Sequence, residues 1–191
     1  MAEDRSSILK PDRNEAPWAN RTIALVGLMG AGKSTVGRRL AGKLGRSFYD
    51  SDNEIEKAAG LSVSDIFSLH GEEEFRRGEQ SVLKRLLEEP PHVLATGGGA
   101  YLNPETRDLM REKAVTVWLN ADLETLWKRV SRRTHRPLLR RPDAKEVLSN
   151  LFDQRRPIYE QADLTVHSVD GPHSKTVVSI IKALETWTPQ P

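Results

Sequence analysis

The stretch Gly27–Thr35 constrains the fold of this chain most, because it reads G-L-M-G-A-G-K-S-T and fits the pattern G-x-x-x-x-G-K-[ST] at every fixed position. The short apolar run Thr22–Val26 before it fits a buried strand, and apolar residues at helical spacing follow it. The motif therefore has the strand, loop and helix context that phosphate binding requires. An ordinary glycine-rich turn is the alternative, but such a turn would need neither both flanks nor every fixed residue.

The loop is expected to hold the phosphates of ATP. Glycines let the backbone wind tightly so that N–H groups point inward, and the start of the following helix adds a positive dipole end. In this motif Lys33 would reach the β- and γ-phosphates, and the Ser34 hydroxyl would ligate Mg²⁺. The residues of the loop expected to contact ATP are Gly30, Ala31, Gly32, Lys33, Ser34 and Thr35.

Composition limits the kind of protein to which the loop belongs. At 191 residues the chain suits one domain, and the sequence predicts a disordered leader over residues 1–20 and a single domain over residues 21–188. The net charge of +2, from 29 basic and 27 acidic residues, gives no sign of a nucleic-acid or membrane surface. Without cysteine there is no disulfide or thiolate metal site, and the leader lacks the apolar core of a secretory signal. A cytoplasmic location is therefore expected.

Two carboxylates follow the second predicted strand, Arg46–Asp50. Ligands in open α/β sheets bind at the carboxyl ends of strands, so Asp50 and Asp52 are expected beside the phosphate loop. The alternative is helix capping, because an Asp at a strand-to-helix junction is a good N-cap. Capping requires one such residue, and this junction has two.

Two further features lie between Glu72 and Gly99. The predicted helix Glu72–Glu89 carries Arg76 and Glu79 at a spacing that fits a simple surface ion pair, so spacing alone favours a structural role for Arg76. The predicted strand His92–Thr96 ends in three consecutive glycines, Gly97–Gly99. Glycines there indicate that the backbone passes very close to another group, the alternative being a flexible loop.

An arginine-rich segment, Ser131–Arg141, is interrupted by Pro137 and cannot form a continuous helix. Since the chain has a phosphate loop, we interpret the segment as a lid over an anionic ligand, at about residues 131–143. The alternatives are an RNA-contacting basic patch and an inert loop. An RNA-contacting patch would show steep salt dependence.

The order of predicted elements is β-α-β-α-α-β-α-β-α-lid-α-β-α. This order is typical of an α/β fold: a doubly wound, five-stranded parallel sheet with helices on both faces.

Taken together, the motifs resemble those of the shikimate kinase family, P-loop kinases of the nucleoside-monophosphate-kinase type. The likeness covers nearly the whole chain after the leader. The matching stretches are Gly27–Thr35 with Val36-Gly37, Asp50-x-Asp52, Phe75-Arg76-Arg77-Gly78-Glu79, Gly97–Gly99, Arg136-Pro137-Leu138-Leu139 and Arg155-x-Pro157-x-Tyr159.

This resemblance implies Mg²⁺-dependent transfer of the ATP γ-phosphate to the 3-hydroxyl of shikimate, in aromatic amino-acid biosynthesis. A monomer is expected. By the same resemblance, Asp52 would bind ring hydroxyls of shikimate, Asp50 would position Mg²⁺ through water, and Arg129 would lie near adenine. The residues implied as catalytic are Lys33, Asp52 and Arg136, and those implied as shikimate-binding are Asp52, Arg76, Gly97, Gly98, Gly99 and Arg155. A planar guanidinium fits a carboxylate bidentately, which suits both shikimate-binding arginines.

The sequence departs from the family pattern in two places. The stretch between Arg129 and Arg136 lacks the glycines often found there, and Val169–Pro172 matches the adenine loop only loosely, so it is not among the predicted site residues. Three rival functions differ in their motifs. A kinase for gluconate or a nucleotide would not need the triglycine with both arginines, a GTP-binding switch would need an N-K-x-D motif that is absent, and an RNA-binding module would use the arginine-rich segment.

Overall fold

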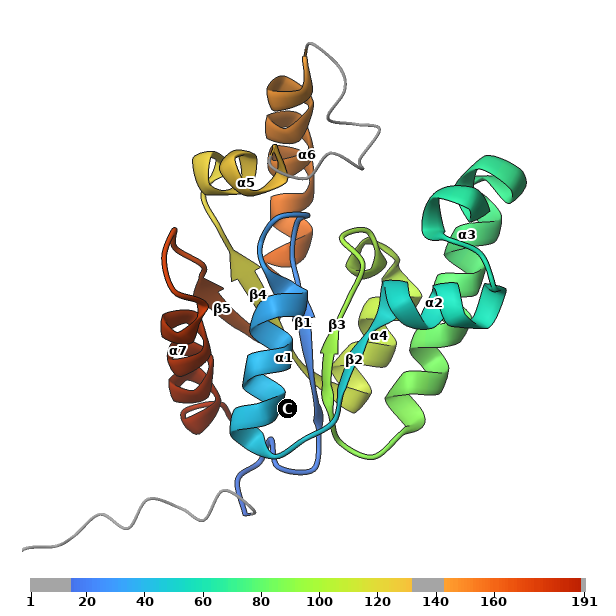
Figure 1. Cartoon of the computed structure of the whole chain (residues 1–191). Coiled ribbons are helices and arrows are strands. Elements are labelled where there is room, and N and C mark those ends of the chain that lie inside the picture. The colour runs from blue at the N-terminus through green and yellow to red at the C-terminus, as the bar shows by residue number, and fades with distance from the viewer. Residues whose placement is uncertain (1–14, 132–142, 190–191) are drawn as a thin grey trace, which may run out of the picture.

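The computed structural model describes residues 15–131 and 143–189. At its centre is a five-stranded sheet in the order β2-β3-β1-β4-β5, and every neighbouring pair is parallel (Figure 1). The strands are β1 (Thr22–Val26), β2 (Phe48–Asp50), β3 (Val93–Ala95), β4 (Ala114–Asn120) and β5 (Leu164–His167). The predicted α/β fold with five parallel strands is confirmed.

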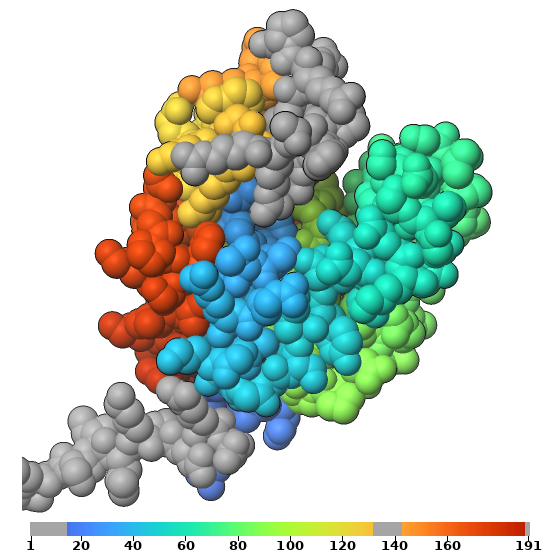
Figure 2. Space-filling view, viewed as in Figure 1, coloured from blue at the N-terminus to red at the C-terminus, as the bar shows by residue number. Residues whose placement is uncertain are grey.

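Helices cover both faces of this sheet, and Figure 2 shows α1 (light blue) beside α7 (orange-red) on the face in view. Helices α1 and α7 pack together, with α1 against β1 and β3, whereas α4 contacts β4 and α3; Figure 1 shows α1 in front of the strands and α4 behind them. The helices are α1 (Lys33–Leu44), α2 (Ser51–Ala59), α3 (Val63–Glu88), α4 (Pro104–Lys113), α5 (Leu123–Val130), α6 (Ala144–Tyr159) and α7 (His173–Glu185), with a short 3-10 turn η1 (Ala100–Leu102). Of the described helices, none has the length and apolar character of a membrane span.

The central strand β1 is buried along its whole length, which explains its uninterrupted apolar sequence. It lies between β3 and β4, and Ile23 and Leu25 are fully buried. Its carboxyl end leads directly into the glycine-rich loop. The core therefore fixes the position of that loop relative to the neighbouring strands.

Helix α3 has a break at Gly71, just before the predicted helix Glu72–Glu89. Gly71 has a φ of 81° and interrupts the helical backbone, a left-handed conformation that favours glycine. The part of α3 before Gly71, residues 63–70, begins at a helix cap. The Ser62 hydroxyl accepts a hydrogen bond from the Asp65 N–H at 3.1 Å and donates one to the Asp65 carboxylate at 2.6 Å. Because the backbone is kinked at Gly71, the parts of α3 before and after it point in different directions.

The predicted leader, residues 1–20, is too long at its carboxyl end. Residues 15–20 pack on the domain, and Trp18 is only 3% exposed. The Arg46 guanidinium lies 5.1 Å from the Trp18 ring centroid and donates to the carbonyl oxygens of Ala19 and Arg21, at 2.5 and 2.8 Å. The predicted lid at about residues 131–143, including Arg136, lies outside the described residues except at its ends, Ser131 and Asp143.

A buried histidine lies at the opposite end of the sheet from the glycine-rich loop. His92 is fully buried just before β3, and its Nδ1 lies 3.0 Å from the Pro90 carbonyl oxygen. Because that oxygen can only accept, Nδ1 carries the ring hydrogen. The other ring nitrogen, Nε2, is buried without a hydrogen-bond partner in the described part of the chain. Burial lowers the pKa of His92 below its ordinary value, so the folded protein holds it neutral.

We expect this histidine to make the protein less stable in mild acid. Below the pKa of His92 in the unfolded chain, the unfolded state gains a proton that the folded state does not, so the free energy of unfolding falls. From about pH 7.5 to about pH 5.5 the contribution is about 1 kcal/mol. The variant His92→Asn, whose amide can still donate to Pro90, removes this contribution. The free energy of unfolding, measured with urea at both pH values, should therefore decrease less in the variant than in the wild type, by that amount. An equal decrease in both proteins would contradict this account.

Candidate active site

The phosphate loop joins β1 to α1 in a conformation that requires its glycines. Gly27, Gly30 and Gly32 have φ values of 131°, 85° and 96°. A Cβ at Gly27 would lie 2.9 Å from the Leu119 carbonyl oxygen, and one at Gly30 would lie 2.7 Å from a Val130 methyl. Helix α1 begins at Lys33 with no side-chain cap on its first N–H groups. These N–H groups are suited to an anion such as a phosphate.

Lys33 lies within this loop. Its side chain is largely buried, and Nζ donates to the carbonyl oxygens of Gly27, at 2.7 Å, and Leu28, at 3.1 Å. The ammonium is thus held beside the inward-facing loop. A charge in this position can neutralise phosphate oxygens without a large movement.

The two predicted aspartates have different positions. Asp50 ends β2 and caps α2, since its carboxylate accepts from the Asp52 N–H at 3.2 Å. The capping alternative therefore applies to Asp50. Asp52, in the first turn of α2, turns its carboxylate toward the triglycine, where Oδ1 would lie 2.8 Å from a Cβ at Gly97. Capping thus accounts for one aspartate and leaves the other facing the site.

The triglycine lies at the centre of the converging polar groups. A Cβ at Gly97 would also lie 2.8 Å from Glu79 Oε1, and one at Gly99 would lie 2.6 Å from both terminal nitrogens of Arg76. Any side chain at these positions would collide with charged groups. The close approach that three glycines predict is confirmed, and it brings α2 and α3 together at the end of β3.

Helix α6 reaches the triglycine as well. Arg155 Nη1 lies 3.5 Å from the Gly98 carbonyl oxygen, a long contact, and the Tyr159 hydroxyl donates to the same oxygen at 2.5 Å. Burial raises the pKa of Tyr159, so its hydroxyl keeps its proton and remains a donor. Asp52, Arg76 and Arg155 thus meet around one short loop although the chain separates them widely.

Glu79 belongs to this cluster and was not predicted as a site residue. It is 3% exposed, and its Oε2 accepts from Arg76 Nη1 at 2.7 Å, while Oε1 is buried without a hydrogen-bond partner among the described residues. Burial raises the pKa of Glu79, and Arg76 opposes that rise. Helical spacing could have found it, because Phe75, Glu79, Val82 and Leu86 form one buried stripe.

We expect Glu79→Gln to weaken shikimate binding about fivefold, because Arg76 keeps a hydrogen bond but loses the charge that strengthens it. Isothermal titration calorimetry with shikimate measures the change. Glu73→Gln, an exposed carboxylate on the same helix, is the matched control and should bind as the wild type does. A Glu79→Gln protein with wild-type affinity would show that the ion pair does not position Arg76.

Arg129, at the end of α5, connects the phosphate loop to the loop after β5. Its guanidinium donates to the carbonyl oxygens of Gly30, Ala31 and Val169, at 3.3, 3.2 and 2.8 Å, and to the Ser168 hydroxyl at 3.0 Å. The Ser168 hydroxyl itself donates to the Ala31 carbonyl oxygen at 3.0 Å. The loosely matching segment after β5 therefore lies beside the phosphate loop.

The described residues suit a magnesium ion that is held mainly by the phosphates of a bound nucleotide and by water. In residues 15–131 and 143–189, no three His, Asp or Glu side chains gather closely enough to hold a metal ion by themselves. Mg²⁺ in kinase sites usually binds one or two protein groups together with waters and phosphates. A hydroxyl at Ser34 and a carboxylate at Asp50 fit that donor set.

Comparisons with known proteins agree with this geometry. A family model described as shikimate kinase matches residues 29–185. A shikimate kinase from Caulobacter vibrioides is 57% identical over 169 residues, which cover 88% of this chain and 84% of that protein. A solved shikimate kinase from Acinetobacter baumannii, in complex with shikimate, superposes with a TM-score of 0.82 at 38% identity and covers 86% of this chain and 93% of that one.

A gluconokinase from Sinorhizobium meliloti 1021 is more distant. Its TM-score is 0.58 at 20% identity, with 86% of this chain and 91% of that chain covered, so it shows a shared fold alone. The family model spans most of this chain, and the Caulobacter relative is far above the identity at which family membership is in question. The chain therefore belongs to the shikimate kinase family.

Proposed function

We propose that this protein transfers the γ-phosphate of ATP to the 3-hydroxyl of shikimate, producing ADP and shikimate 3-phosphate. The observation that carries the proposal is the convergence of Asp52, Arg76 and Arg155 on Gly97–Gly99, next to the phosphate loop. Two guanidiniums and one carboxylate at one loop suit an acceptor that has both a carboxylate and hydroxyl groups. Family membership supports the same acceptor.

In the proposed reaction the loop N–H groups and Lys33 hold the phosphates of ATP. Mg²⁺, bound by Ser34 and through water by Asp50, would supply charge to neutralise the phosphate oxygens. Arg76 and Arg155 would grip the carboxylate of shikimate, and Asp52 would accept a hydrogen bond from the acceptor hydroxyl. Since phosphoryl transfer has a loose transition state, positioning and charge neutralisation contribute more than a strong base does.

Two arginines complete the proposal. Arg129 would contribute to nucleotide binding, and its bonds to Gly30 and Ala31 support a role in shaping the phosphate loop. Arg136 lies outside the described residues, so its assignment to the transferring phosphate depends on the sequence motif alone. We also propose a cytoplasmic monomer that acts on small molecules; the nearly balanced charge gives no sign of a nucleic-acid partner.

A coupled ADP-release assay with ATP and Mg²⁺ tests the proposal. The panel contains shikimate, quinate, gluconate and nucleoside monophosphates, and we expect the highest kcat/KM with shikimate. Gluconate tests the alternative kinase of another small hydroxy acid. A higher kcat/KM with gluconate or a nucleotide than with shikimate would overturn the proposal.

A further inference from the structure

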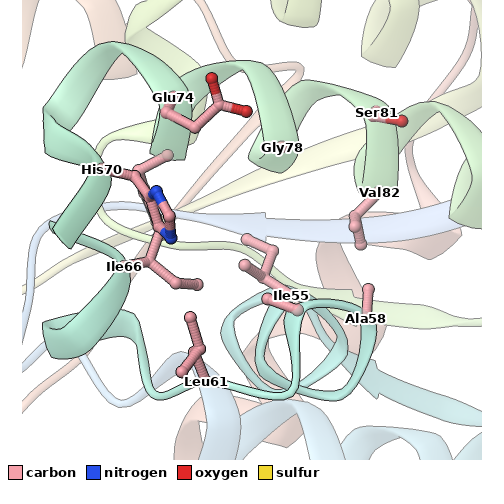
Figure 3. Close-up of a pocket in the computed structure, with 11 residues that line it drawn as sticks. Ile55, Ala58, Leu61, Ile66, His70, Glu74, Gly78, Ser81 and Val82 are labelled. Carbon is pink, nitrogen blue, oxygen red and sulfur yellow. The ribbon is translucent and has the colours of Figure 1, made fainter.

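A cavity of about 390 Å³ lies between α2 and α3 (Figure 3). Its volume falls within the range of small-molecule sites, and its walls are mainly apolar. Helix α2 and the turn after it contribute Ile55, Ala58, Ala59 and Leu61, and α3 contributes Ile66, His70, Glu74, Phe75, Gly78, Ser81 and Val82. None of these residues belongs to the proposed acceptor or nucleotide site.

Gly78 keeps the middle of this cavity open. A glycine inside a helix costs about 1 kcal/mol relative to alanine, so its presence in α3 is unfavourable for the helix itself. No steric reason requires it, because a Cβ at Gly78 would meet nothing within 4 Å. At Gly97 and Gly99, by contrast, a Cβ would collide with neighbouring groups. Since Gly78 lines the cavity, a side chain at this position would project into open space.

The two ionisable groups of the cavity lie at one end. Figure 3 shows His70 and Glu74 together there, whereas Ala58, Val82 and the Ser81 hydroxyl lie at the other end. Glu74 pairs with Arg77 through Oε2, and no described residue donates to its Oε1. An apolar gap between two helices favours a planar ring, and a carboxylate at its mouth favours an ammonium group.

The cavity shares its two helices with the acceptor site. Helix α2 carries Asp52, and α3 carries Arg76 and Glu79. Phe75 forms a cavity wall, its ring lies 4.4 Å from the Phe67 ring centroid, and the Arg76 guanidinium lies 5.2 Å from the centre of the Phe75 ring. A ligand that displaces Phe75 or changes the spacing of the helices therefore acts on Arg76 directly.

We propose that this cavity binds a small aromatic amine and that its occupation changes the affinity for the acceptor. The ring lies between Ile55 and Phe75, and the ammonium group lies against Glu74. The coupling rests on the proposed function, whereas the binding does not. Two separate measurements therefore distinguish a failure of the cavity from a failure of the kinase assignment.

Calorimetry with phenethylamine tests binding. We expect a Kd of about 1 mM for so small a ligand, and weaker binding of 2-phenylethanol, which lacks the charge. Gly78→Leu fills the cavity and should weaken phenethylamine binding at least about tenfold. Gly42→Leu is the matched control, since Gly42 is also a helical glycine with nothing within 4 Å of a Cβ, but on α1. It should bind the probe as the wild type does.

Glu74→Gln should reduce the affinity for phenethylamine and leave that for 2-phenylethanol unchanged. Saturating phenethylamine should change the KM for shikimate by about fivefold and leave the KM for ATP unchanged. Absence of binding to the wild type, or equal binding to Gly78→Leu, overturns the site. Binding without any change in the KM for shikimate overturns the coupling. Circular dichroism verifies that both leucine variants fold.

Discussion

Replacing Lys33 with methionine is expected to lower kcat about a thousandfold, because the transferring phosphate would lose its nearest fixed positive charge. Methionine has a similar length, so the loop keeps its shape. The carbonyl oxygens of Gly27 and Leu28 would each lose a hydrogen bond from Nζ. That loss should cost about 1 to 3 kcal/mol of stability, which a folded domain of this size tolerates.

The matched control is Lys43→Met, the same substitution at an exposed position of α1. It should retain wild-type kcat. Steady-state kinetics with the coupled assay measures both variants, and circular dichroism shows whether each is folded. If folded Lys33→Met kept more than a tenth of wild-type kcat, the assignment of the phosphate loop would be wrong.

The fold could be predicted because its local signals agree with one another. The apolar run Thr22–Val26 is the buried central strand, and the spacing of apolar residues after Lys33 is that of α1. The predicted helix Glu72–Glu89 is the part of α3 that follows the break at Gly71. The order of the strands in the sheet could not be predicted in this way, because pairing between β1 and β4 joins residues far apart in the chain. The order of the predicted elements specified the type of sheet, a doubly wound parallel one, but not the order of its strands.

Arg76 shows the limit of spacing as evidence. The ion pair that its distance from Glu79 suggests does exist, at 2.7 Å, but Glu79 is buried, and the same guanidinium would crowd a side chain at Gly99. The pair is therefore not the simple surface pair that spacing suggests, and a role of Arg76 in binding the acceptor stays a prediction. Spacing along one helix reveals neighbours on that helix. It does not reveal that the loop after β3 and helix α6 pack beside Arg76, because these contacts form only in the tertiary structure. Spacing does place Glu79 on the buried stripe of its helix, but it does not show that the stripe faces the triglycine at this point.

The misplaced leader boundary has a similar cause. Composition marks residues 1–20 as polar, and a single tryptophan hardly changes that average. Trp18 nevertheless packs under Arg46, whose guanidinium also donates to nearby carbonyl oxygens. Burial lowers the pKa of Arg46 without removing its charge at neutral pH, so the contact persists under ordinary conditions. A contact with one distant arginine leaves no periodic signal in the sequence.

Arg155→Ala is expected to weaken shikimate binding by about 2 to 5 kcal/mol, or roughly 30-fold or more. The proposed carboxylate would lose one of its two guanidinium partners, and alanine leaves a gap beside Gly98. Isothermal titration calorimetry with shikimate measures the loss. Arg156→Ala is the matched control, because this neighbouring arginine is exposed and pairs with Glu160 at 2.8 Å. It should bind shikimate normally.

A second variant separates charge from shape at the same position. Lysine keeps the positive charge but cannot form two parallel hydrogen bonds, so Arg155→Lys should recover only part of the affinity. Full recovery would mean that Arg155 acts as a point charge and that no bidentate grip exists. Unchanged affinity in Arg155→Ala would remove α6 from the acceptor site. The acceptor would then be held by α2 and α3 alone, and the approach of Arg155 to Gly98 would be a packing contact.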